Sequence, residues 1–189
     1  MVSRTLSRLS RYNRPYFEEQ GQEVLRKIDM IDFEAYYSRS PASGIWILEY
    51  GSKFIGLIAV DASLDSESEQ TLSSNVDDSQ NKAIRKQIGK KGTSSVATIR
   101  HFYIMEEYRR AFVQEDLLHF AVSHAFKDPK VKVIRAVDAT YDKWKAAAFT
   151  KEGFSVEKEL RRIGVLRWIV RSRELTRERW EEKQKSSSS

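Results

Sequence analysis

Two side chains able to take up a proton lie in and directly after one predicted strand. His101 falls in the stretch 96–105, which is rich in β-branched and aromatic residues, and alternates there with Ile99 and Tyr103 on one face. Glu106 follows at the end of this stretch. An imidazole or a carboxylate placed in a cleft can act as a general base. A half-buried strand histidine and a solvated turn are the alternatives without chemistry.

Anion binding is indicated a few residues further on. Arg109 and Arg110 precede a predicted amphipathic helix. The start of a helix offers backbone N–H groups and the positive end of the helix dipole to an anion, and two guanidinium groups add charge. Gln114 can donate a further N–H from its side-chain amide. The apolar stripe of this helix is formed by Leu117, Leu118, Ala121, Val122, Ala125 and Phe126.

The composition excludes several other kinds of site. The 189 residues include no cysteine, so disulfides and thiolate-bound metals are ruled out. The three histidines do not stand at metal-ligand spacing, and we expect no metal. No apolar run reaches the length of a membrane-spanning helix, and the N-terminal stretch lacks the apolar core of a signal peptide. We therefore expect a cytoplasmic protein.

Positive charge gathers in residues 1–15, within a chain whose net charge is +6. Arg4, Arg8, Arg11 and Arg14 occur there without an acidic residue. This segment could hold the protein at an anionic membrane surface or an acidic partner, or be a solvated tail. Nucleic acid is the least favoured partner, because only charge supports it and part of the chain is acidic.

The chain outside this segment predicts one α/β domain over residues 16–172 and a polar tail over 173–189. A long insertion at 62–95, acidic and serine-rich first and basic afterwards, interrupts the domain. Gly51 and Ser52 form a two-residue hairpin turn. The expected elements are helices at 16–27 and 31–37, strands at 44–50, 53–61 and 96–105, a helix between 110 and 128, a strand at 132–139, a helix at 142–151, and strands at 154–160 and 165–171.

This order of elements resembles the GNAT superfamily of N-acetyltransferases over roughly residues 16–172. Two motifs carry the resemblance. IMEEYR at 104–109 looks like the family's V-x-P-x-Y-R passage, and KAAAFTKEGF at 145–154 looks like its A-x-x-L-Y-x-x-x-G-F signature. The resemblance implies an α+β fold with a mixed central sheet flanked by helices. It also implies acetyl-CoA as the acyl donor and direct transfer of the acyl group to an amine, whose identity the sequence does not give.

The resemblance further implies which residues would serve this reaction. The strand ending at Met105 would hold the pantetheine through its backbone, the turn after it would hold the pyrophosphate, and a nearby base would take the proton of the amine. The residues in these positions are Ile104, Arg109, Arg110, Phe112 and Gln114 for the cofactor and His101 and Glu106 for the proton.

Two departures from the family pattern favour a second interpretation. Phe112 and Gln114 stand where the family's pyrophosphate loop has glycines, and a phenylalanine adds bulk and can deny the backbone its conformation. Phe149 replaces the tyrosine that would protonate the departing thiolate, and Tyr141 is a distant substitute. The alternative to an enzyme is therefore a GNAT-fold binding or accessory module with weak or no CoA binding.

Overall fold

The computed structural model describes residues 27–30, 32–68 and 89–187. The basic segment 1–15 and the expected helix at 16–27, apart from its last residue, lie outside the described residues, and so does the middle of the predicted insertion. Attachment of the N-terminal arginines to a membrane or an acidic protein stays a prediction.

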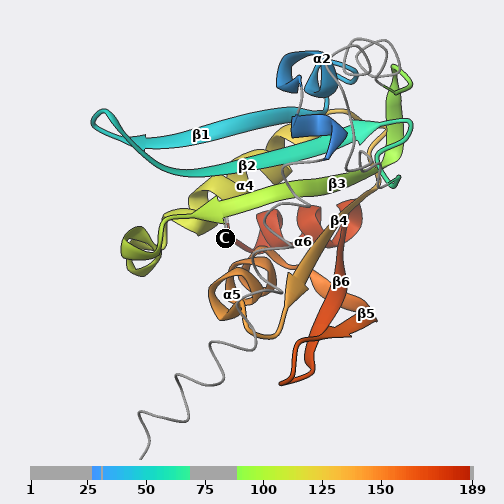
Figure 1. Cartoon of the computed structure of the whole chain (residues 1–189). Helices are drawn as coiled ribbons and strands as arrows, with labels where there is room; N and C mark the ends of the chain where they lie inside the picture. Colours follow the sequence, from blue (N-terminus) through green and yellow to red (C-terminus); the bar gives the residue numbers. More distant parts are fainter. Residues whose placement is uncertain (1–26, 31, 69–88, 188–189) are drawn as a thin grey trace, which may run out of the picture.

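A six-stranded mixed sheet forms the centre of the molecule (Figure 1), with the strand order β1-β2-β3-β4-β6-β5. All neighbouring strands are antiparallel except β3 and β4. The strands are β1 (Gly44–Tyr50), β2 (Lys53–Ser63), β3 (Thr93–Ile104), β4 (Val133–Ala139), β5 (Ser155–Ile163) and β6 (Trp168–Thr176).

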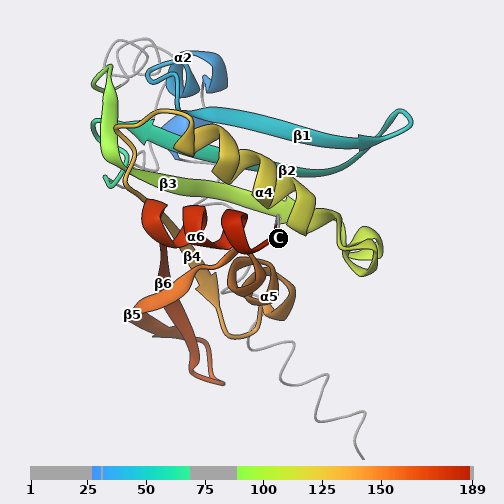
Figure 2. The same ribbon diagram turned by 180° about the vertical axis from the view of Figure 1, so that it is seen from behind.

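Helices cover both faces of this sheet. Figure 2 shows the longer helices α4, α5 and α6 together on one face, and η1 and α2 lie on the other. The main core is the layer between the sheet and the longer helices, where Ile58, Phe102 and Ile134 meet Leu118 and Phe149. The helical elements are η1 (Ile28–Met30), α2 (Phe33–Tyr37), η2 (Glu106–Ala111), α4 (Val113–Phe126), α5 (Lys143–Glu152) and α6 (Arg177–Ser187).

The two parallel strands at the centre separate soon after they meet. β3 and β4 pair only from Val96 to Thr98 on β3, although β3 continues to Ile104. Figure 1 shows the two strands running in different directions beyond this point. Within the described residues, the second half of β3 therefore has no strand partner on the side of β4, and its N–H and C=O groups there need other partners.

A β-bulge in β3 changes which side chains share a face. Ala59 of β2 pairs with His101, whereas the next residue, Val60, pairs with Ile99, so that Arg100 is the extra residue. Ile99 and Phe102 both lie in the main core. The expectation that Ile99 shares the face of His101 is wrong, because strict alternation does not hold across a bulge.

The structure confirms the predicted hairpin turn and the predicted end of α5. Tyr50 pairs with Lys53 across the expected two-residue turn, and Gly51 has a φ of 63°. Gly153 ends α5 with a φ of 109°, a conformation that favours glycine. The structure thus places two expected turns where the glycines predict them.

The C-terminal elements differ from the expectation. The turn between β5 and β6 lies at residues 164–167 rather than at Ile163-Gly164, so both strands extend further along the chain than predicted. β6 ends at Thr176, inside the expected polar tail, and α6 follows directly. The ring of Trp180 on α6 lies 5.2 Å from that of Phe126. Trp180 therefore packs α6 against the core, although the polar composition of this helix does not predict such packing.

Both ends of the predicted insertion contact Arg39, which lies two residues after the end of α2. Arg39 Nη1 is 2.7 Å from Asp65 Oδ1. The N–H of Gly92 donates to the carbonyl oxygen of Arg39 at 2.9 Å. Strand β2 continues to Ser63 and β3 begins at Thr93, so both strands extend into the range expected as a loop.

Candidate functional site

A pocket of about 400 Å³ lies against β3. Its walls come from η1 and α2, from β1, β2 and β3, and from the start of α5. The residues that line it are Met30, Phe33, Ile45, Leu57, Arg100, His101, Phe102, Tyr103 and Lys145.

His101 belongs to a chain of buried polar groups at this pocket. Its Nε2 lies 2.6 Å from Asp29 Oδ2, and Tyr37 donates its hydroxyl to the same oxygen at 2.7 Å. Asp29 and Tyr37 are buried. Burial alone would raise the pKa of Asp29, but the hydrogen bonds from His101 and Tyr37 and nearby positive charge lower it below its usual value. The imidazole therefore faces a carboxylate that stays ionised.

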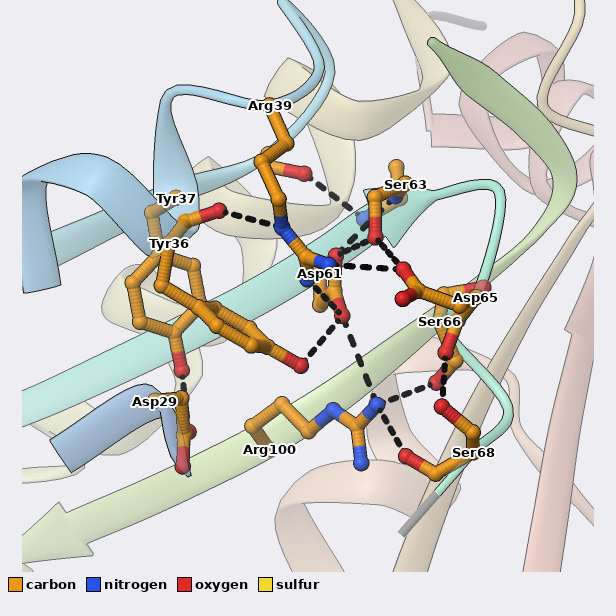
Figure 3. A network of polar contacts seen from close by, with 12 residues as sticks. Asp29, Tyr36, Tyr37, Arg39, Asp61, Ser63, Asp65, Ser66, Ser68 and Arg100 are labelled. Carbon is orange, nitrogen blue, oxygen red and sulfur yellow. Dashed lines mark hydrogen bonds and ion pairs between the residues drawn. The ribbon is translucent and has the colours of Figure 1, made fainter. Parts of the chain in front are cut away.

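Arg100, next to His101 in sequence, belongs to a second buried network (Figure 3). Asp61 is its centre, because this fully buried carboxylate accepts from Arg39 at 3.1 Å, from the hydroxyl of Tyr36 at 3.0 Å and from Ser63 Oγ at 2.6 Å. Arg100 Nη2 lies 3.4 Å from the same carboxylate. Burial raises the pKa of Tyr36 to about 12.

The turn after β3 keeps an unusual backbone conformation without glycine. Phe112 joins η2 to α4 with φ 59° and ψ 15°, in the left-handed region. Its ring is exposed. The sequence predicts that a phenylalanine in place of glycine can prevent this conformation. Phe112 nevertheless adopts it. The left-handed turn directly before α4 is therefore present, at a cost of roughly 1–2 kcal/mol.

Two side chains of this turn, Arg109 and Gln114, point inward rather than toward an outside ligand. Arg109 Nε donates to the carbonyl oxygen of Ile104 at 3.0 Å, and its guanidinium carbon lies 4.8 Å from the ring centre of Trp144. Gln114 is buried and donates from Nε2 to the carbonyl oxygen of Arg109 at 3.1 Å, while its Oε1 has no partner among the described residues. Arg110 is exposed. Of the two arginines, only Arg110 stands open to an approaching anion.

Glu106 and Phe149 lie away from the pocket. Glu106 is exposed in η2 and does not line the pocket, so the structure does not bring this candidate base together with His101. Its neighbour Glu107 pairs with Lys53 at 2.6 Å. Phe149 is buried in the core between Phe102 and Phe154. The position that would supply a proton in the family is here an apolar core contact.

The start of α5 uses its acidic residue for an ion pair. Asp142 occupies the N-cap position of the helix, but its side chain does not cap the helix. It lies 3.1 Å from Lys145 Nζ, a residue that lines the pocket. Tyr141 is exposed and packs edge-on against Trp168. Neither contact puts a hydroxyl group at the pocket.

Within the residues that the structure describes, no helix is long and apolar enough to cross a membrane. In the same part of the chain, no three histidine or acidic side chains gather as metal ligands.

Sequence reasoning missed three members of the site. Asp29 lies outside the elements expected to carry chemistry, and only the fold brings it to His101, which is 72 residues away. Arg100 was not predicted, because strict alternation along the strand places it on the face opposite His101. Trp144 carries no motif. A bulge has no firm sequence signal here, since neither glycine nor proline marks it.

Solved acetyltransferase structures share the arrangement of these elements. An acetyltransferase of the GNAT family from Streptococcus pneumoniae is similar with a TM-score of 0.56 and 13% sequence identity, over 76% of this chain and 72% of that one. The aminoglycoside acetyltransferase AAC(6')-Ib in complex with coenzyme A is similar with a TM-score of 0.51 and 15% identity, over 76% and 72%. Mutant forms of the spermidine/spermine N-acetyltransferase SpeG from Vibrio cholerae give 0.50 and 14%, over 76% and 69%.

No protein-family model and no curated sequence matches the chain. At these identities the likeness establishes the fold, which is the GNAT fold. The expected fold class, a mixed sheet flanked by helices, is confirmed.

Proposed function

We propose that this chain, which has the GNAT acetyltransferase fold, is an acyl-CoA-dependent N-acyltransferase that transfers an acetyl group from acetyl-CoA directly to an amine. One observation carries the proposal. His101 lies in a pocket with a buried, ionised carboxylate on its ring nitrogen, in the half of β3 that β4 leaves open. The reaction requires a general base, because an ammonium must lose a proton before its nitrogen can attack a thioester.

The backbone around this edge fits acetyl-CoA. The open half of β3 ends at Ile104, whose peptide groups would meet the pantetheine. The left-handed turn at Phe112 precedes the N-terminus of α4, where N–H groups and the helix dipole would meet the pyrophosphate. Arg110 adds exposed positive charge beside it. Acetyl-CoA supplies an electrophilic thioester carbonyl when it is bound.

The side chains of the pocket would handle the proton of the amine. His101 donates from Nε2 to Asp29, which leaves Nδ1 as the ring nitrogen that takes the proton. Asp29 then stabilises the imidazolium that forms, and Tyr37 holds Asp29 through its hydroxyl group. Glu106 has no part in this proposal, because it is exposed in η2 outside the pocket.

A binding or accessory module remains the second candidate, and the inward turn of Arg109 favours it. The carbonyl oxygen of Ile104 already accepts from Arg109 Nε, which is held over Trp144. A pantetheine that uses this carbonyl competes with Arg109 for it. Loss of the hydrogen bond from Arg109 costs about 0.5–1.5 kcal/mol and weakens CoA binding by that amount.

Calorimetry with acetyl-CoA, followed by product analysis with a panel of primary amines, separates the two candidates. The enzyme hypothesis predicts binding of acetyl-CoA and acetyl transfer that falls by roughly 10²–10⁴ in His101→Gln. His119→Gln, a change of the same kind in a different groove on α4, should leave transfer unchanged. No binding at millimolar acetyl-CoA removes the enzyme hypothesis. Binding without transfer to any amine supports the module.

A further inference from the structure

Two neighbouring polar side chains of β3 line the same pocket, at the position of the bulge. His101 and Arg100 both line it, although consecutive residues of a regular strand point to opposite faces. Ile99 before them and Phe102 after them are both in the core. A proton acceptor and a guanidinium group therefore stand side by side on one wall.

The guanidinium group of Arg100 has an unused donor. Its side chain is only 7% exposed, and Nη2 is taken by Asp61 and by the carbonyl oxygens of Ser66 and Ser68. Arg100 Nε is buried and has no hydrogen-bond partner among the described residues. A buried N–H of a charged group without a partner is costly, so a ligand that accepts from it gains affinity.

The charges on the pocket wall have one sign. Among the described residues, its ionisable lining side chains are Arg100, His101, Lys145 and the phenol of Tyr103, and no described carboxylate lines it. Asp29 and Asp142 lie behind this wall, engaged with His101 and Lys145. A polycationic amine would meet no acidic side chain of the described residues on this wall and would approach like charges.

The remaining wall is apolar. Aliphatic, thioether and aromatic side chains from η1, α2, β1, β2 and β3 complete the pocket. Its volume of about 400 Å³ suits a small ligand with an apolar group. These residues are Met30, Phe33, Ile45, Leu57, Phe102 and Tyr103.

We infer that the acceptor is an apolar α-amino acid, whose amine lies at His101 and whose carboxylate accepts from Arg100 Nε. The inference rests on the proposed N-acyltransferase function and names its substrate class. Arg100 and His101 are consecutive residues that line one pocket, and we therefore assign to it a ligand whose amine and carboxylate are joined through one carbon atom. Arg100 also lines a smaller cavity of about 190 Å³.

The reaction balances with these groups alone. The amine nitrogen forms a bond to the acetyl carbon as the carbon–sulfur bond of acetyl-CoA breaks. The ammonium loses two protons, of which one leaves through His101 to solvent and one ends on the sulfur of coenzyme A. The products are an N-acetyl amino acid and coenzyme A, with no oxidant or reductant.

A binding experiment tests the inference independently of catalysis. Calorimetry of the full chain compares N-acetyl-L-phenylalanine with N-acetylphenethylamine, which has the same ring and amide but no carboxylate. We expect the first to bind roughly tenfold or more tightly, as for a charge-assisted hydrogen bond. A parallel assay compares acetyl transfer to L-phenylalanine, phenethylamine and spermidine, and we expect transfer to L-phenylalanine alone.

Variants identify the residue responsible. Arg100→Lys keeps the positive charge beside Asp61 but removes Nε, and it should abolish the preference for the carboxylate while leaving binding of N-acetylphenethylamine unchanged. Arg162→Lys, the same change at an exposed position outside the pocket, should keep the preference. Thermal unfolding of each variant shows whether it is folded. Arg100→Gln provides a second removal of Nε if the lysine variant unfolds.

Each outcome bears on a different claim. Equal binding of the two acetyl compounds, binding of neither, or a preference that survives in Arg100→Lys overturns the inference. Selective binding of N-acetyl-L-phenylalanine without any acetyl transfer supports the pocket's ligand class and overturns the proposed enzyme function instead. Acetylation of spermidine in preference to L-phenylalanine supports an N-acyltransferase and overturns the amino acid inference.

Discussion

Asp29 Oδ2 and His101 Nε2 lie 2.6 Å apart across 72 residues of sequence, and this contact joins η1 to the centre of β3. Both side chains are largely shielded from solvent, with 3% and 13% of their surface exposed. A carboxylate that is buried and hydrogen-bonded by an imidazole and a phenol has little freedom to rearrange. The contact therefore both positions a base and holds a short helical element on the sheet.

The first prediction is that these two residues contribute to stability as a unit. Asp29→Asn and His101→Gln should each destabilise the fold, and the double variant should cost less than the sum of the two. The expected coupling is about 1–3 kcal/mol, as for hydrogen bonds to charged groups. Urea unfolding of the four proteins measures it. Additive losses would mean that the observed contact contributes nothing to folding.

The second prediction concerns the backbone at Phe112. Its left-handed φ of 59° is strained for any residue with a Cβ atom. The free energy of unfolding of Phe112→Gly should therefore exceed that of Phe112→Ala by about 1 kcal/mol. Both variants lose the exposed ring, and the comparison therefore isolates the backbone. Phe112→Gly should also bind acetyl-CoA more tightly than Phe112→Ala, because the phosphate can approach closer. Equal stability of the two would show that the turn is unstrained.

The third prediction concerns the competition between Arg109 and CoA for Ile104. Arg109→Lys keeps the positive charge but removes the Nε donor that occupies the carbonyl oxygen of Ile104. Acetyl-CoA should bind the variant more tightly by roughly 0.5–1.5 kcal/mol. Arg110→Ala should weaken binding, since this exposed residue is the arginine open to the pyrophosphate. Calorimetry measures both changes. Weaker binding in Arg109→Lys would mean that Arg109 turns outward to the phosphates.

Much of the fold follows from local sequence signals. The hairpin turn at Gly51, the end of α5 at Gly153 and the apolar stripe of α4 are each set by a few neighbouring residues, and the structure has all three. The displaced β5–β6 hairpin shows the limit of such signals. Gly164 begins a turn that continues to Arg167, and nothing local separates this longer turn from a tighter one.

The site depends on contacts that no local pattern carries. The alternation of β3 predicts the face of Ile99 wrongly, because a bulge is decided by how β2 and β3 pair over their whole length. Arg109 was expected to face the pyrophosphate because of its position before a helix. The guanidinium group of Arg109 instead lies over the ring of Trp144, a residue of α5. Charge and spacing identify which residues are near a site, whereas the fold decides where they point.

The fourth prediction concerns the network around Asp61. Its carboxylate is fully buried and shared by Arg39, Arg100 and Tyr36, so Asp61→Asn leaves two guanidinium groups without adequate compensation. We expect a loss of about 3–5 kcal/mol in the free energy of unfolding. Asp65→Asn, which removes a partly exposed partner of Arg39, should cost clearly less. Urea unfolding at neutral pH compares them. Equal losses would show that Asp61 is not the centre of the network.

The fifth prediction is that stability falls between about pH 10 and 12 in part through Tyr36. Burial raises the pKa of this phenol from 10.0 to about 12, so the unfolded chain loses its proton at a lower pH than the folded chain. The stabilisation is complete below pH 10 and is lost as the pH rises toward 12. Tyr37, whose pKa burial also raises, adds to the same slope.

Tyr36→Phe tests this assignment. The variant should be less stable at neutral pH, because the hydrogen bond to Asp61 is lost, but its free energy of unfolding should fall less steeply above pH 10. Tyr50→Phe, at a phenol that is 73% exposed, should keep the slope of the unchanged protein. Urea unfolding at closely spaced pH values gives the slopes. If Tyr36→Phe and the unchanged protein lose stability in parallel, the phenol of Tyr36 ionises as freely in the folded state as in the unfolded one.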